Sequence, residues 1–212
     1  MAKRLIWNFE ILSTQAELTP GGLISALSPL QWEARYFWPE NEVVTLHGLD
    51  DNYLNLSYYT YKHREDTYFL LDTLAINIKK RHDQLFYKPM LAKLDGHLLD
   101  GINGFGKKIN LHTYPTETLL PGLPTMNSVQ ILDLLQKAKT INVTKELVIY
   151  DFPSSPIIKL ELSRLTINTK NYFSLCLQGK SADLIQKLGA LLLKNQVSCQ
   201  YVNFLKRILI IN

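Results

Sequence analysis

Alternation of apolar and polar residues at every second position is the feature of this chain that most limits its fold. At residues 30–38, Trp32, Ala34, Tyr36 and Trp38 fall on one face of a predicted strand. Successive side chains of a strand point to opposite faces, so this period indicates a half-buried strand. Further strand-like runs cover residues 66–71, 74–80, 84–88, 146–151, 157–167 and 172–178. Turn-forming residues separate these runs.

Two segments have helical spacing instead. A serine of the type that caps helices begins each of them, Ser128 before residues 129–135 and Ser181 before residues 182–188. Residues 201–211 fit a strand and a short helix equally well. Many short strands with two helices predict an α+β fold, built on a large antiparallel β-barrel or tunnel with a few flanking helices.

The composition is that of a folded domain. Of the 212 residues, 46% are hydrophobic and 20% are charged, which excludes a disordered tail. A Pro-Gly-Gly turn at residues 20–22 predicts an N-terminal extension, residues 1–30, packed on a main domain of residues 31–212. The two cysteines are too few for a disulfide scaffold, and no apolar run reaches the roughly 20 residues of a membrane span. We therefore expect a cytoplasmic protein without membrane contact.

Charged residues with strand period carry the functional signal. They share one face on each of three successive predicted strands: Arg64 and Asp66; Lys79 and Arg81; and Lys88. Later in the chain, Glu161 alternates with leucines. If the strands are neighbours, cations gather in one volume, which is unfavourable unless acids or a bound anion compensate them. Triphosphates are suitable anions because Lys and Arg neutralise phosphoryl oxygens. The alternative is a solvated face of an antiparallel sheet.

At these residues the sequence resembles the CYTH superfamily, the triphosphate tunnel enzymes that include class IV adenylyl cyclases and thiamine triphosphatases. The similar motifs are Arg64-Glu65-Asp66-Thr67-Tyr68, residues 78–81 with 85–88, Leu160-Glu161-Leu162, and residues 172–179. They occur in the family's order, and the match covers roughly residues 31–205. The resemblance implies a tunnel whose inner wall binds a triphosphate group, with metal-assisted hydrolysis or cyclisation in active members.

The resemblance also implies roles for individual residues. The phosphate ligands it implies are Arg64, Lys79, Arg81 and Lys88, with Arg35 as a further basic candidate. Glu33 and Glu161 are the implied metal ligands, for Mg or Mn. Several acidic positions of the family are not acidic here: Arg35, Phe86 and Gln178 stand at them. Fewer carboxylates weaken metal binding, and with it the activation of water for hydrolysis.

We therefore expect this protein to bind a triphosphate-containing or polyphosphate ligand in a basic tunnel. Whether it also hydrolyses a phosphoanhydride with the help of a metal stays open, as does its oligomeric state. Two alternatives remain: a catalytically inactive CYTH-like interaction module, and a single-stranded nucleic-acid binding protein. The second rests on aromatic residues beside basic ones, Tyr53, Tyr58, Tyr59, Tyr61 and Tyr68 near Lys62 and Arg64.

Residues 101–108 come close to the spacing of a P-loop but lack its final Ser or Thr. A P-loop also requires a helix directly after it, whereas the residues that follow are extended in pattern. We therefore expect a flexible glycine loop here. The five histidines have no zinc-ligand spacing, and Cys176 lies on a predicted strand as a core residue.

Overall fold

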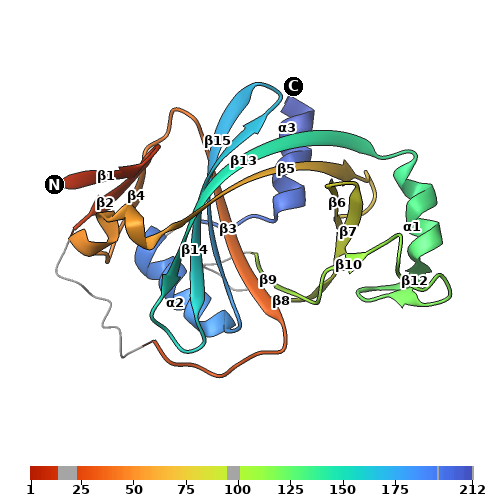
Figure 1. Cartoon of the computed structure of the whole chain (residues 1–212), viewed down its shortest axis with the longest axis horizontal. Helices are drawn as coiled ribbons and strands as arrows, with labels where there is room; N and C mark the ends of the chain where they lie inside the picture. Colours follow the sequence, from red (N-terminus) through yellow and green to blue (C-terminus); the bar gives the residue numbers. More distant parts are fainter. Residues whose placement is uncertain (14–22, 95–100, 195, 212) are drawn as a thin grey trace.

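A ten-stranded antiparallel sheet forms the frame of the protein (Figure 1). The computed structural model describes residues 1–13, 23–94, 101–194 and 196–211. The sheet contains β3 (Gln31–Pro39), β5 (Thr60–Leu70), β6 (Asn77–Arg81), β7 (Gln84–Lys88), β8 (Met90–Leu94), β9 (Ile102–Phe105), β10 (Ile109–Asn110), β13 (Lys139–Phe152), β14 (Ile158–Ile167) and β15 (Lys170–Gly179). Their order across the sheet is β10-β7-β6-β5-β13-β14-β15-β3-β9-β8. The predicted α+β fold with a large antiparallel, barrel-like sheet is confirmed.

The chain itself joins the two ends of this sheet. β7 lies next to one edge and β8 forms the other, yet only Pro89 separates the two strands in sequence. The backbone N–H of Gly106, between β9 and β10, donates a hydrogen bond of 2.9 Å to the carbonyl of Pro89. The sheet therefore curls so that β7 and β8 come together at Pro89, and it has an inner and an outer face.

Smaller elements flank this sheet. The strands β1 (Ala2–Ile6), β2 (Phe9–Leu12) and β4 (Val44–Leu46) form a three-stranded sheet, and β11 (Leu119–Leu120) pairs with β12 (Leu123–Asn127). The helices are α1 (Ser128–Leu135), α2 (Ala182–Leu193) and α3 (Tyr201–Ile211), and two 3-10 turns, η2 (Asp51–Leu54) and η3 (Leu56–Tyr58), precede β5. No helix in the described part of the chain has the length and apolar character needed to cross a membrane.

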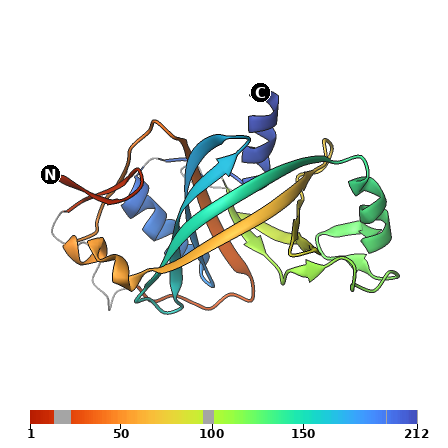
Figure 2. The same ribbon diagram turned by 45° about the horizontal axis from the view of Figure 1, so that its top comes forward.

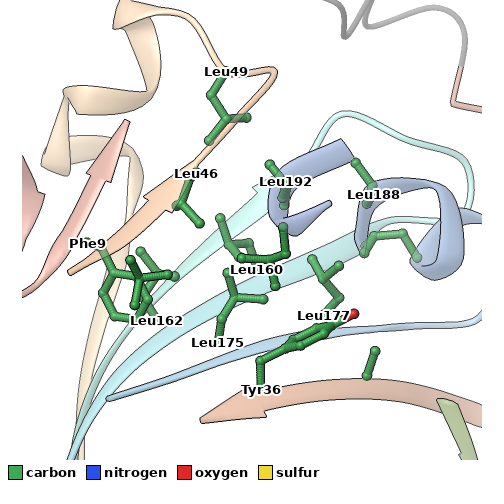
Figure 3. Close-up of a cluster of buried hydrophobic side chains, with 14 of the residues drawn as sticks. Phe9, Tyr36, Leu46, Leu49, Leu160, Leu162, Leu175, Leu177, Leu188 and Leu192 are labelled. Carbon is green, nitrogen blue, oxygen red and sulfur yellow. The ribbon is translucent and has the colours of Figure 1, made fainter. Parts of the chain in front are cut away.

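The main core lies between the outer face of the sheet, the three-stranded sheet and α2 (Figure 3). Leu160 and Leu162 of β14 are fully buried in it, beside Leu188 and Leu192 of α2. The residues between them on β14 point to the inner face instead. One strand thus packs apolar side chains outward and presents Glu161 inward, which fixes the direction of that carboxylate.

Helix α3 packs at one end of the inner face. Its buried Val202, Leu205 and Ile208 form a cluster with residues of β5, β13 and β14. In both ribbon views α3 stands beside the long strands β13 and β15 (Figures 1 and 2). Residues 201–211, whose sequence fits a strand and a helix equally well, therefore form a helix. Their apolar residues recur at helical spacing and face the sheet.

Two predictions about local structure are wrong in detail. The cap of α1 is Asn127, whose side chain accepts from the N–H of Gln130 in a capping box, so Ser128 is the first helical residue. Residues 101–108 are not a flexible loop, since they contain β9, all four residues of which are buried. Ser181 caps α2 as predicted. Residues 1–12 supply β1 and β2, whose Phe9 contacts Trp38 and Phe173 edge-on.

Candidate functional site

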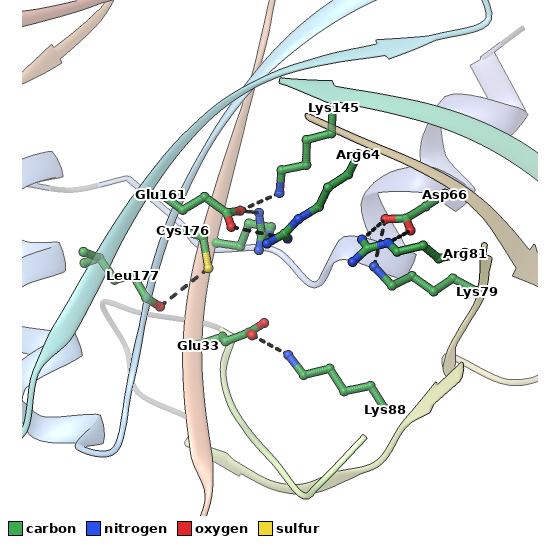
Figure 4. Close-up of polar contacts among 11 residues, drawn as sticks. Glu33, Arg64, Asp66, Lys79, Arg81, Lys88, Lys145, Glu161, Cys176 and Leu177 are labelled. Atoms are coloured by element: carbon green, nitrogen blue, oxygen red, sulfur yellow. Dashed lines mark hydrogen bonds and ion pairs between the residues drawn. The ribbon is translucent and has the colours of Figure 1, made fainter. Parts of the chain in front are cut away.

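A cavity of about 220 Å³ lies on the inner face of the curled sheet (Figure 4). All seven residues that the sequence analysis singles out for phosphate or metal line it: Arg35, Arg64, Lys79, Arg81, Lys88, Glu33 and Glu161. They come from β3, β5, β6, β7 and β14, five strands that span the sheet. The structure thus brings these residues together. Their roles as ligands remain a prediction.

Register places these side chains on the same face. In the pairing of β15 with its neighbours, Cys176 lies opposite both Arg35 and Glu161, which forms one inward-facing row. Lys145 of β13 lies opposite Arg64 of β5. Directly opposite residues of an antiparallel pair share a face, so two rows of charged side chains converge on the cavity.

Glu161 anchors the first charged cluster. Its Oε1 accepts from Nζ of Lys145 at 2.5 Å and from Nη1 of Arg35 at 3.0 Å, and its Oε2 lies 3.9 Å from Nη1 of Arg64. The side chain is only 2% exposed. Burial alone would raise the pKa of Glu161, but Lys145 and Arg35 outweigh burial and hold the pKa well below its ordinary 4.5. This carboxylate is therefore ionised.

Asp66 anchors the second cluster. Arg81 donates two hydrogen bonds of 2.6 Å to Asp66, from Nε to Oδ1 and from Nη2 to Oδ2. The Nζ of Lys79 donates a third hydrogen bond to Oδ2, at 2.8 Å. Burial opposes ionisation of Asp66, yet its hydrogen bond with Arg81 and the charge of Lys79 lower the pKa on balance. For Lys79, burial dominates and lowers the pKa from 10.5 to about 7.

Glu33 and Lys88 form a third ion pair across the cavity, from β3 to β7. The Nζ of Lys88 also lies 4.1 Å from the centre of the Phe105 ring. Burial disfavours the ionised form of Glu33, but Lys88 and Arg35 lower its pKa overall. All three carboxylates are thus ionised and held by cations.

Several residues of the site were not predicted. Lys145 lies one residue before the predicted strand 146–151, so its place on the inward face of the longer β13 was missed. Lys108 belongs to the segment interpreted as a loop, and its Nζ lies 3.7 Å from the centre of the Phe86 ring. Tyr201 was not predicted as a site residue because the sequence does not decide between strand and helix for residues 201–211. Lys145 shares one face of its strand with Val143 and Leu147. This pattern could have identified Lys145 as an isolated charge on an apolar face.

Tyr201 lines both the main cavity and a smaller one of about 80 Å³ beside it. Its ring stacks on Tyr68 with 4.9 Å between ring centres, and Cζ of Arg35 lies 5.2 Å above it. Burial raises the pKa of the Tyr201 hydroxyl, so the side chain is neutral. Helix α3 therefore contributes a neutral aromatic wall to a cavity otherwise dominated by charge.

Cations outnumber carboxylates in this wall. Seven Lys and Arg side chains line the cavity against three carboxylates, a formal surplus of four positive charges when every lysine is protonated. The whole chain also has a formal net charge of +4, so the rest of the molecule is neutral in sum. Arg64 and Lys108 are the cations least engaged by acids, since Arg64 reaches Glu161 only at 3.9 Å and Lys108 contacts an aromatic ring.

The residues present do not fit a divalent metal held by the protein alone. Within the described ranges, no three His, Cys, Asp or Glu side chains are grouped so that they could hold a metal ion. Mg²⁺ prefers an octahedron of oxygen ligands. Here the carboxylates of Glu33 and Glu161 are already bound by Lys88, Lys145 and Arg35. The role of these two glutamates as metal ligands stays a prediction from the resemblance.

The tyrosines behind the nucleic-acid alternative do not form one surface. Tyr53 and Tyr59 pack against Tyr150, with ring centres 5.0 Å and 5.2 Å from it. Tyr68 is buried at the cavity, whereas Tyr58 and Tyr61 are exposed. Three of the five side chains therefore contribute to packing and cannot stack on the bases of a strand.

No protein-family model and no curated protein match the chain. Several solved structures are similar to it, including the following two. One is a candidate adenylate cyclase from Bacillus halodurans, with 13% identity, a TM-score of 0.37, and coverage of 66% of this chain and 79% of that one. The other is the RNA triphosphatase Pct1 of S. pombe in complex with the Spt5 CTD, with 14% identity, a TM-score of 0.33, and coverage of 77% of each chain. Similarity at this level assigns no activity to this protein.

Proposed function

We propose that this protein binds the triphosphate group of a small molecule, or a short polyphosphate, in the charged cavity. In this proposal Arg35, Arg64, Lys79, Arg81 and Lys88 hold the phosphoryl oxygens. The observation that carries it is the formal surplus of four positive charges in the lining of one partly enclosed cavity. Like charges that lose hydration repel each other strongly, and a polyanion relieves that repulsion.

The chemistry of the lining agrees with the proposal. A guanidinium donates two parallel hydrogen bonds to a phosphate, and an ammonium acts as a point charge. Arg64 and Lys108 have the most donors free of carboxylates, so they are the first candidates to meet an incoming anion. Cations from separate strands can contact several phosphoryl groups at once, which favours a chain of phosphates over a single one.

The proposal stops at binding. Hydrolysis in the manner that the resemblance implies needs a metal to neutralise charge and to activate water. The glutamates that would hold it are engaged by Lys and Arg side chains. We therefore assign the residues of this cavity no catalytic step.

Isothermal titration with tripolyphosphate tests the proposal, together with thermal unfolding in its presence. We expect saturable binding and a melting temperature that rises with ligand concentration, because a ligand that binds only the folded state stabilises it. Orthophosphate at the same concentration should give a smaller shift. The absence of both heat and stabilisation at millimolar tripolyphosphate would refute the proposed function.

Arg64→Ala is the most informative variant for the binding role. Arg64 makes only a long ion pair to Glu161, so its removal perturbs the fold little. Loss of a charge-assisted hydrogen bond at this partly buried position costs about 1.5–3 kcal/mol, which corresponds to about a 10- to 150-fold weaker affinity. Lys62→Ala is the matched control, since Lys62 lies on the same face of β5, two residues away, but is exposed and outside the lining. Equal losses in the two variants would contradict a specific role.

A further inference from the structure

The three carboxylates in the wall contact cations in the way a bound phosphate would. Resting on the proposed function, we propose that Glu33, Asp66 and Glu161 are internal counter-anions. In the free protein they occupy donors of the phosphate-binding cations. A polyanionic ligand then binds by taking over these contacts, without any metal. The three acids thereby set the affinity of the site and its preference for highly charged ligands.

Asp66 gives the clearest geometry. Its two oxygens receive the forked pair of donors from Arg81, at 2.6 Å each, and a third donor from Lys79 at 2.8 Å. Arginine binds carboxylates and phosphates with the same fork. Asp66 therefore takes the place that a phosphoryl group would need at Arg81, and its side chain is only 5% exposed.

Glu161 plays the same part for three other cations. It lies between Lys145, Arg35 and Arg64, which come from three different strands. Without an anion among them, these cations would stand unpaired in a water-poor space, which is strongly destabilising. The Glu161 carboxylate of β14 compensates these charges in the absence of a ligand: it accepts hydrogen bonds from Lys145 and Arg35 and forms a longer ion pair with Arg64.

The alternative assignment of Glu33 and Glu161 is to a metal. A metal ligand presents free oxygen lone pairs to an open position, whereas these glutamates direct oxygens at ammonium and guanidinium groups. Seven cations around such a position would also repel a divalent ion. Charge compensation explains the contacts of both residues, and metal ligation explains none of them.

Exchange of internal anions has a consequence for selectivity. A ligand with one anionic group can replace one carboxylate and leaves the other two in place. A triphosphate carries several such groups on one chain, so the second and third exchanges become intramolecular. Affinity should therefore rise steeply from orthophosphate to pyrophosphate to tripolyphosphate, also in the presence of EDTA.

The test replaces each carboxylate by its neutral amide, in Glu33→Gln, Asp66→Asn and Glu161→Gln, and measures tripolyphosphate binding by calorimetry in EDTA. Removal of a competing negative charge should tighten binding by at least about fivefold, given the strength of charge interactions at low exposure. Glu65→Gln is the matched control because Glu65 neighbours Asp66 on β5 but is exposed. Its affinity should equal that of the wild type.

Glu33→Gln keeps the test decisive if the other variants fail to fold. Glu33 is the most exposed of the three acids, at 15%, and has one hydrogen-bonded cation, Lys88. If the wild type binds tripolyphosphate and Glu33→Gln binds it equally well or more weakly, the inference is overturned but the proposed function is not. The same holds if EDTA abolishes binding by the wild type. The absence of binding by the wild type and by every variant would instead overturn the proposed function.

Discussion

Burial controls the charge of single residues in this cavity. Lys79 and Lys145 are both lysines on inward faces, and burial lowers their pKa values from 10.5 to about 7 and about 8. The neighbouring carboxylates counteract this effect, and Arg35 and Arg81 keep those carboxylates ionised. Near neutral pH the positive charge of the wall is therefore adjustable, and an incoming anion would complete the protonation of Lys79.

Lys79 makes binding depend on pH. A bound anion favours the ammonium form, so affinity should be highest where Lys79 is already protonated, below about pH 7, and should fall as the pH rises. The loss is up to about tenfold per pH unit for a single coupled proton. Lys79→Arg keeps its charge throughout this range. Tripolyphosphate titrations at pH 6 to 9 should therefore give a flatter profile for the variant, since the ligand's own ionisation is common to both proteins. Parallel profiles would rule out this role for Lys79.

At the scale of elements, the two faces of each strand explain what the sequence could and could not predict. β7 has the predicted bounds and β14 lies within a residue of them, because turn-forming residues, His82-Asp83 and Pro156, mark where these runs begin. Helix α3 stayed open because a short apolar run fits both periods. The segment 101–108 was mistaken for a loop because of its glycines. Gly104 instead lies in a closely packed position, where a Cβ would come within 2.9 Å of Cδ1 of Leu30 and 3.1 Å of the Trp32 ring.

The period of the strands predicts that the charged side chains lie in one volume, but it does not predict which acid pairs with which cation. Arg64, Lys79, Arg81 and Lys88 could be predicted to share a volume, since each sits on the polar face of its strand. Which acid meets which cation depends on register between strands far apart in sequence, such as Glu161 with Lys145 and Arg35. No local pattern contains this information.

Helix α3 provides a test at the same scale. Leu205 is fully buried in the cluster between α3 and the inner face, so Leu205→Ala should lower the free energy of unfolding by about 2–5 kcal/mol. Urea denaturation followed by circular dichroism measures this loss. Ile210→Ala is the control, because Ile210 is 83% exposed and its truncation should change stability by less than about 0.5 kcal/mol. Similar midpoints for the two variants would show that α3 does not pack as described.

For the whole molecule, the interior carboxylates tie stability to pH. The pKa values of Glu33, Asp66 and Glu161 lie below their ordinary values of 4.5, 3.8 and 4.5. A lowered pKa contributes stability that is present above the ordinary value and is lost as the pH falls towards the folded value. The melting temperature should therefore decrease steadily below about pH 4.5. Glu161→Gln should show a shallower decrease, and a wild-type melting temperature constant from pH 5 to pH 2.5 would contradict the assignment.

The passage of the chain from β7 to β8 limits how wide the ring can open. Lys88 and Met90 belong to opposite margins of the sheet, and two peptide units between them span at most about 7 Å. Pro89 thus fixes the distance between the end of β7 and the start of β8. At this point the two strands cannot separate further without a break in the backbone, so the connection of the chain keeps the ring closed here, whichever ligand the cavity holds.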